Sequence, residues 1–169
     1  ETAVRLNGFG MNVYGYDPYC ADKEEYVHIL RNKQELQNEI NKFDYIVSTM
    51  PDTTETKGFI NKELICRMRS NAVFVNVGRR ATINETDLYN ALKNKQIGGA
   101  VLDMFEKLPN PITNKFRRLK NVIVLPGVAA ISREVNERLD RHICNNIVLL
   151  SENQMPNNII NKKDEEICC

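Results

Sequence analysis

Charged side chains closely follow three candidate strands of this sequence, where a parallel sheet would bring them to one edge. Asp17 comes after the run MNVYGY, Arg79 comes shortly after VFVN, and Asp103 comes after GAVL. Doubly wound sheets bind their ligands at the carboxyl ends of their strands. These three residues are therefore candidates for a ligand site, with a turn cap before Pro18 as the structural alternative for Asp17.

The elements that would position these side chains alternate between short apolar runs and amphipathic segments. Continuous apolar runs are typical of strands buried on both faces of a parallel sheet. The runs are Met11–Tyr16, Val27–Leu30, Tyr45–Ser48, Val73–Asn76, Ala100–Leu102 and Val122–Leu125. Helices are predicted over Thr2–Phe9, Lys33–Asn41, Asn61–Arg69, a segment capped by Asn84, and Ile131 to about Leu150. This alternation predicts an α/β fold with a Rossmann-type doubly wound parallel sheet in three layers.

Composition excludes several classes of protein. The 169 residues carry 23 Lys and Arg against 22 Asp and Glu, so no basic excess indicates a nucleic-acid or membrane-surface binder. Hydrophobic residues make up 42%, which suffices for a core, and no apolar stretch reaches the ~20 residues of a membrane helix. The five cysteines form no C-x-x-C pair, so no metal site is expected. Reduced thiols and the lack of a visible leader predict a cytoplasmic location.

Four segments resemble one family. Residues 9–19, 50–80, 92–109 and 122–132 are similar to the NAD-binding domain of D-isomer-specific 2-hydroxyacid dehydrogenases, in the same order and at the expected intervals. In that family, a first strand and a glycine-rich phosphate loop lie directly before the segment that matches residues 1–9. The resemblance therefore implies a sheet incomplete at its N-terminal edge. It divides the chain into an NAD-binding domain over 1–150, lacking that strand and loop, and a tail over 151–169 that returns toward a missing substrate domain.

The resemblance also assigns roles to individual residues. Arg79 matches the arginine that binds the substrate, and its planar guanidinium can grip a carboxylate and polarise a keto oxygen. The structural alternatives are a surface ion pair for Arg79, a capped turn for the loop after residue 49, and a cap for Asp103. The implied cofactor-binding residues are Asp17, Met50, Pro51, Thr56, Val77, Gly78 and Asp103. Because the first strand of the family precedes the segment matched here, Asp17 would end the second strand of the dinucleotide-binding unit. A carboxylate there hydrogen-bonds the ribose hydroxyls and repels the extra phosphate of NADP, so the resemblance implies NAD.

The sequence departs from the family at the positions that transfer the proton. Leu108 stands where the family has a glutamate, and Gly127 stands where it has the catalytic histidine. The two histidines, His28 and His142, are predicted to lie away from the site. Arg80 replaces a glycine of a tight turn and would strain the backbone if that turn needs a positive φ.

The family-level function is oxidation of a D-2-hydroxy acid, or reduction of a 2-oxo acid such as glyoxylate, hydroxypyruvate or pyruvate, with NAD(H). A positioned general acid–base contributes roughly 10²–10⁴ in rate, so a chain without it should be slow. The alternative is a catalytically inactive NAD-binding relative or fragment that serves as a regulatory or scaffolding module. A third possibility is a fragment whose sequence is in error at the key positions. By analogy with the family, the long helix near 131–150 implies a homodimer. The expected ligand is a small-molecule substrate, and no nucleic-acid or membrane partner is expected.

Overall fold

The computed structural model describes residues 2–20, 27–103 and 115–158. Its strands are short and parallel wherever they pair. They are β1 (Val13–Tyr16), β2 (Val27–Leu30), β3 (Tyr45–Ser48), β4 (Val73–Asn76), β5 (Gly99–Leu102) and β6 (Val122–Val124). The α-helices are α1 (Thr2–Gly8), α2 (Lys33–Glu39), α3 (Lys62–Ile65), α4 (Glu85–Lys93) and α5 (Val135–Ser151), and the 3-10 turns are Ile40–Lys42, Arg80–Thr82 and Lys115–Arg118.

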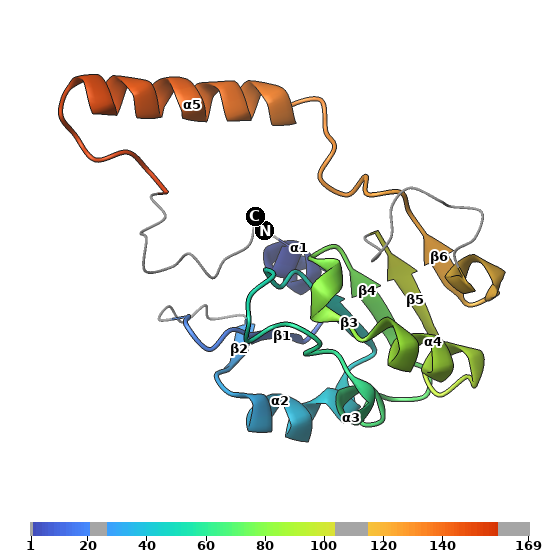
Figure 1. Cartoon of the computed structure of the whole chain (residues 1–169). Coiled ribbons are helices and arrows are strands. Elements are labelled where there is room, and N and C mark those ends of the chain that lie inside the picture. The colour runs from blue at the N-terminus through green and yellow to red at the C-terminus, as the bar shows by residue number, and fades with distance from the viewer. Residues whose placement is uncertain (1, 21–26, 104–114, 159–169) are drawn as a thin grey trace.

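Asparagine side chains start three of these helices. The Oδ1 atoms of Asn32, Asn61 and Asn84 accept backbone N–H groups of the first turns of α2, α3 and α4. Such caps satisfy donors that a helix leaves unpaired at its amino end. The caps fix where each helix begins after a strand, and the helices then lie against the sheet (Figure 1).

The strands form two separate parallel sheets. One contains β1 and β2, and the other has the order β3-β4-β5-β6. In the larger sheet Val47 pairs with Val75, and Val75 pairs with Val101, so that side chains of the same face stand in register. Among the described residues no strand joins β1 to β3, and their facing edges border a cleft.

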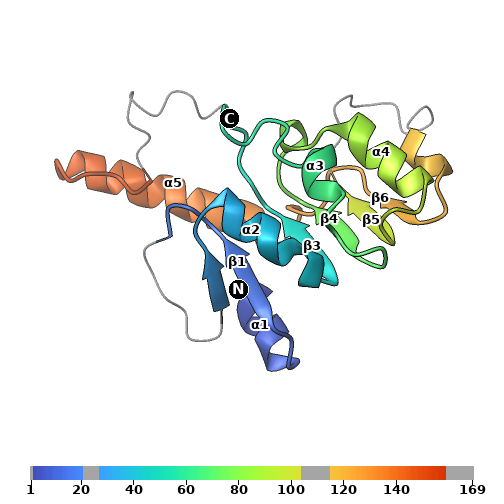
Figure 2. The same ribbon diagram turned by 90° about the horizontal axis from the view of Figure 1, so that it is seen from below.

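Burial differs between the two faces of the larger sheet. Phe74, Asn76, Ala100 and Leu102 point to one face and are at most 3% exposed. This face packs against the core residues of α3 and α4, such as Leu64. Figure 2 shows α2, α3 and α4 along the same side of the strands. This parallel sheet with flanking helices is the Rossmann-like α/β fold that the sequence predicts.

The other face corrects one expectation. The continuous apolar runs predict burial on both faces, but Tyr45, Val47 and Ile123 are 60%, 47% and 59% exposed. Tyr45 and Val47 border the open cleft beside β3, with residues of α1 on its other wall, which leaves this part of the face unpacked. The predicted helix over 61–69 is also shorter, because α3 ends at Ile65 and the chain then turns toward β4.

Helix α5 lies apart from the rest of the fold (Figure 1). None of its 17 residues is buried. The segment after α5 turns back along the helix, because Asn146 Oδ1 accepts the backbone N–H of Asn157 at 2.9 Å. The part of the chain that the structure describes contains no helix long and apolar enough to cross a membrane.

Candidate functional site

The loops after β3 and β4 are joined at the carboxyl edge of the sheet. The backbone N–H groups of Val77 and Gly78 both donate to the carbonyl of Ser48, at 3.1 and 3.0 Å, and the N–H of Arg79 donates to the carbonyl of Met50 at 3.3 Å. The structure thus brings together four of the residues expected in the site: Met50, Val77, Gly78 and Arg79.

Gly78 is required by this close approach. A Cβ atom built on Gly78 would lie 2.9 Å from the backbone N and O of Met50 and from the carbonyl carbon of Thr49. Any side chain would push the two loops apart. The glycine therefore sets the spacing between the loop after β3 and the residues that lead to Arg79.

Pro51 and Thr56 stabilise the turn that follows Met50. The Thr56 hydroxyl donates to the Pro51 carbonyl at 2.6 Å and accepts the Thr53 backbone N–H at 2.9 Å. These bonds are the capped turn expected as the structural alternative. They do not preclude contact with a ligand, so the cofactor-binding roles of Pro51 and Thr56 stay predictions.

Asp17 lies across the cleft from this cluster, at the carboxyl end of β1. Its backbone N–H donates to Leu30 of β2 at 3.2 Å, and its Oδ1 accepts the backbone N–H of Tyr19 at 2.9 Å. The Tyr19 hydroxyl donates to Glu55 Oε2 at 2.7 Å, which connects the loop after β1 with the loop after β3. Sequence patterns gave no signal for Tyr19 or Glu55, since the two are 36 positions apart and neither belongs to a periodic element.

Asp103 is buried at the end of β5, only 3% exposed. Its Oδ1 and Oδ2 accept the backbone N–H groups of Val128 and Ala129, at 2.8 and 2.9 Å. Its own N–H donates to the carbonyl of Asn76 at 3.0 Å, which places it next to the end of β4. Asp103 thus fixes the loop after β6, and its contact with a nicotinamide stays a prediction.

Two buried polar atoms near this edge have no hydrogen-bond partner among the described residues. They are Ser48 Oγ and Asn76 Nδ2, on residues 5% and 0% exposed. Ser48 and Asn76 are register partners at the last positions of β3 and β4. Such groups each destabilise a fold by about 1–3 kcal/mol. The other amide atom of Asn76, Oδ1, accepts the Gly78 N–H at 3.3 Å, so this side chain still contacts the loop after β4.

The two positions that the resemblance assigns to proton transfer hold Gly127 and Leu108. Gly127 has a φ of 78°, a conformation that favours glycine, and Leu108 lies outside the described residues. His28 of β2 faces Tyr14 of β1, with ring centroids 4.9 Å apart. His142 of α5 contacts Asn146. The backbone strain that a positive φ would cause at position 80 does not arise, because Arg80 is not among the described residues with positive φ.

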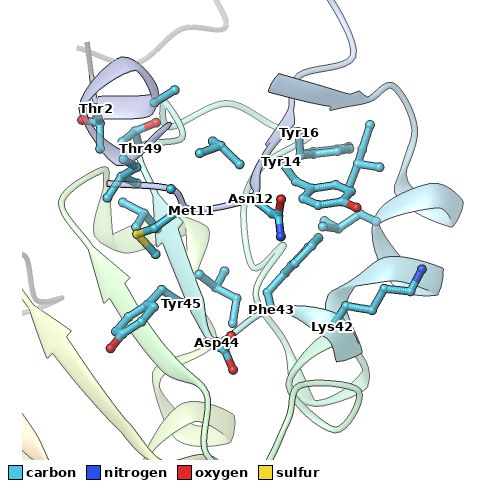
Figure 3. A pocket seen from close by; sticks show the side chains of 18 residues that line it. Thr2, Met11, Asn12, Tyr14, Tyr16, Lys42, Phe43, Asp44, Tyr45 and Thr49 are labelled. Atoms are coloured by element: carbon cyan, nitrogen blue, oxygen red, sulfur yellow. The ribbon is translucent and has the colours of Figure 1, made fainter. Parts of the chain in front are cut away.

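The cleft between β1 and β3 has a volume of about 680 Å³ (Figure 3). Leu6 of α1, Tyr14 of β1, Leu36 of α2 and Ile46 of β3 contribute to its mainly apolar lining. The tyrosine and phenylalanine rings at one end are in contact, since the centroids of Tyr14 and Phe43 are 5.0 Å apart. Side chains that could gather round a metal ion form no cluster in the described ranges.

Comparison with known proteins gives consistent matches over most of the chain. Residues 1–129 match the family described as D-isomer specific 2-hydroxyacid dehydrogenase, NAD binding domain. The glyoxylate reductase of Korarchaeum cryptofilum is 32% identical over 167 residues, covering 95% of this chain and 48% of the reductase. The D-3-phosphoglycerate dehydrogenase of Methanocaldococcus jannaschii is 32% identical, covering 95% of this chain and 30% of that enzyme.

Solved structures agree with these matches. A probable 2-hydroxyacid dehydrogenase from Rhizobium etli, in complex with NADP, aligns with a TM-score of 0.82 and 31% identity over 95% of this chain and 51% of that one. A D-isomer specific 2-hydroxyacid dehydrogenase from Xanthobacter autotrophicus, in complex with NADPH, gives a TM-score of 0.86 at 27% identity, covering 95% and 65%. The chain spans about half or less of the length of the curated relatives it matches.

Proposed function

The chain belongs to the D-isomer-specific 2-hydroxyacid dehydrogenase family, and we propose that it forms the part of such an enzyme that holds NAD(H) for exchange of a hydride with a 2-oxo or 2-hydroxy acid. The observation that carries the proposal is the junction of Met50, Gly78 and Arg79 at the carboxyl edge of a parallel sheet. Doubly wound sheets bind dinucleotides at this edge.

The side chains fit a dinucleotide best at its adenosine end. Asp17 is exposed at the end of β1, and among the described residues only its Oδ1 accepts a hydrogen bond, from the Tyr19 N–H. A carboxylate there would bind the ribose hydroxyls and disfavour a 2′-phosphate, which supports NAD over NADP. Asp103 fits less directly at the nicotinamide end, because each of its oxygens already accepts a backbone N–H.

The proposed reaction moves a hydride between C2 of the acid and the nicotinamide. When bound, NAD(H) accepts or supplies that hydride. Arg79, exposed next to the edge, would bind the substrate carboxylate and stabilise the negative charge that develops on the keto oxygen. With Gly127 at the histidine position, the proton has to come from solvent, which predicts slow turnover.

The direct test compares turnover of glyoxylate, hydroxypyruvate and pyruvate with NADH in the full-length protein and in a Leu108→Glu, Gly127→His double variant. Restoring an acid–base pair should raise kcat by roughly 10²–10⁴. A Leu108→Glu, Gly127→Ala variant is the control for backbone strain at the positive φ of position 127. Equal, negligible turnover in all three, combined with tight NADH binding, would favour the alternative of a silent NAD-binding module.

The cleft between β1 and β3 supports the domain division expected from the sequence. It separates two parallel sheets, and the two edges that face it, β1 and β3, have no strand partner there among the described residues. In our proposal one further parallel strand occupies this place in the whole enzyme and leads into a phosphate-binding loop at the carboxyl edge. The apolar lining and the partly exposed strands β1 and β3 are consistent with such an occupant.

A homodimer is proposed for α5. Val135, Leu139, Ile143 and Ile147 follow one another at four-residue intervals and are 40–60% exposed. Residues four apart lie on the same side of a helix, so they form one apolar stripe. A second copy of the chain could cover this stripe. The free thiols of Cys66 and Cys144 in the described part of the chain are consistent with a cytoplasmic protein.

A further inference from the structure

One hydrogen bond crosses from the smaller sheet to the larger one at the proposed cofactor edge. The Tyr19 hydroxyl, after β1, donates to Glu55 Oε2, after β3, at 2.7 Å. Both side chains are exposed, so the bond lies at the surface where a ligand could approach. The contact is independent of the backbone bonds that join the loops after β3 and β4.

Two carboxylates surround the same pair of tyrosines. Asp17 accepts the backbone N–H of Tyr19, and Glu55 accepts its hydroxyl. The pKa of Tyr19 is raised first by its hydrogen bond to Glu55, and also by the negative charges of Glu55 and Asp17. The pKa of Tyr16 is raised first by burial, and then by the same two charges. Glu55 and Asp17 therefore act on one small region at the carboxyl ends of β1 and β3.

Arg31 and Lys33, two cations that follow β2, contact other groups. The Arg31 guanidinium donates to the carbonyl of Cys20 at 2.8 Å. Lys33 lies over the ring of Phe59, 5.6 Å from its centroid, and Phe59 in turn stacks on Tyr16. Neither cation forms an ion pair with Asp17 or Glu55 within the described part of the chain. Within residues 2–20, 27–103 and 115–158, neither carboxylate forms an ion pair.

We propose that Glu55, positioned by Tyr19, is a second specificity residue of the dinucleotide site, which together with Asp17 rejects the 2′-phosphate of NADP(H). The inference rests on the proposed function, because it assumes that the adenosine ribose binds beside Asp17. A 2′-phosphate there would meet the negative charges of both carboxylates that contact Tyr19, whereas a 2′-hydroxyl can donate to a carboxylate. Similar folds hold NADP or NADPH in the relatives from Rhizobium etli and Xanthobacter autotrophicus, so side chains and not the fold must set this choice.

The test measures dissociation constants of NADH and NADPH by calorimetry for the full-length protein and four variants. Glu55→Gln should bind NADPH about tenfold more tightly relative to NADH than the wild type does, since one like charge is removed from a partly screened site. Glu55→Asp keeps the charge and should leave the ratio near that of the wild type. Tyr19→Phe, which removes the hydroxyl that holds Glu55, should shift the ratio in the same direction as Glu55→Gln but by less.

The matched control is Glu63→Gln. Glu63 is likewise an exposed carboxylate, in the first turn of α3. It accepts a hydrogen bond from Gln37 at 2.8 Å, and removing its charge should not change the ratio. The tenfold shift in Glu55→Gln should shrink when the ionic strength is raised, because salt screens exposed charges. An unchanged NADPH to NADH ratio in Glu55→Gln would overturn the role of Glu55 while leaving the proposed function intact. If the wild type binds neither dinucleotide, both fall.

Discussion

The buried carboxylate of Asp103 accepts the backbone N–H of Val128 at 2.8 Å, and its second oxygen accepts the next N–H along the chain. The bonds join the end of β5 to the loop after β6, 25 positions downstream. That loop carries Gly127, the position that the resemblance aligns with the family's catalytic histidine. Asp103 therefore supports the segment that would present a general base, whether or not it also contacts the cofactor.

Removing one of these acceptors should destabilise the fold. Asp103→Asn keeps one acceptor oxygen and turns an amide toward the other N–H, so we expect a loss of about 1.5–3 kcal/mol in the free energy of unfolding, measured by urea denaturation. Asp140→Asn on exposed α5 serves as the control and should stay within about 0.5 kcal/mol of the wild type. Equal stabilities for the two variants would contradict the structural role of Asp103.

Gly78 should tolerate no side chain. Gly78→Ala places a Cβ 2.9 Å from the Met50 backbone and should lower the free energy of unfolding by about 1–3 kcal/mol. Gly8→Ala is the matched control, since nothing lies within 4 Å of a Cβ at the end of α1. It should be neutral or stabilising by up to about 1 kcal/mol. A Gly78→Ala protein as stable as Gly8→Ala would show that the loops after β3 and β4 do not meet as described.

The Tyr19–Glu55 bond has a consequence at high pH. The bond raises the pKa of Tyr19 above its ordinary 10.0, because ionising the phenol loses the donor and sets two negative charges side by side. A raised folded-state pKa means that the contribution to stability is present below pH 10.0 and is lost as the pH rises through the folded value. Phenolate absorbance, as the difference between the protein and its Tyr19→Phe variant, should therefore appear above pH 10.0. In a Glu55→Gln background, the same difference titration should give a pKa for Tyr19 closer to its ordinary 10.0. A titration curve unchanged by Glu55→Gln would count against the bond.

Helix α5 provides the test of the dimer. Leu139→Glu or Ile143→Glu puts a charge in the apolar stripe and should convert the dimer to a monomer in sedimentation. Glu137→Gln changes a neighbouring exposed residue outside the stripe and should leave the mass unchanged. A wild-type protein that sediments as a monomer at all concentrations would rule out the proposal.

The sequence predicted the strands better than the contacts between them. Tyr45–Ser48 and Val73–Asn76 begin and end where their apolar runs predict, because Pro51 and Gly78 follow them closely. The hydrogen-bond partners of Asp103 could not be predicted in the same way, since they are backbone N–H groups that carry no sequence signature. The exposed face of Val47 was missed for a related reason: apolar periodicity shows that a face can be buried, not which element covers it.

Binding of NAD(H) at the carboxyl edge can be located by hydrogen–deuterium exchange of the full-length protein with and without NADH. We expect slower exchange in the loops after β1, β3 and β4, around Tyr19, Glu55 and Arg79. No change is expected at the opposite edge, where Lys95, Gly98 and Lys120 line a separate pocket. Protection at that opposite edge, or no protection in the three loops at saturating NADH, would show that NAD(H) does not bind at the carboxyl edge.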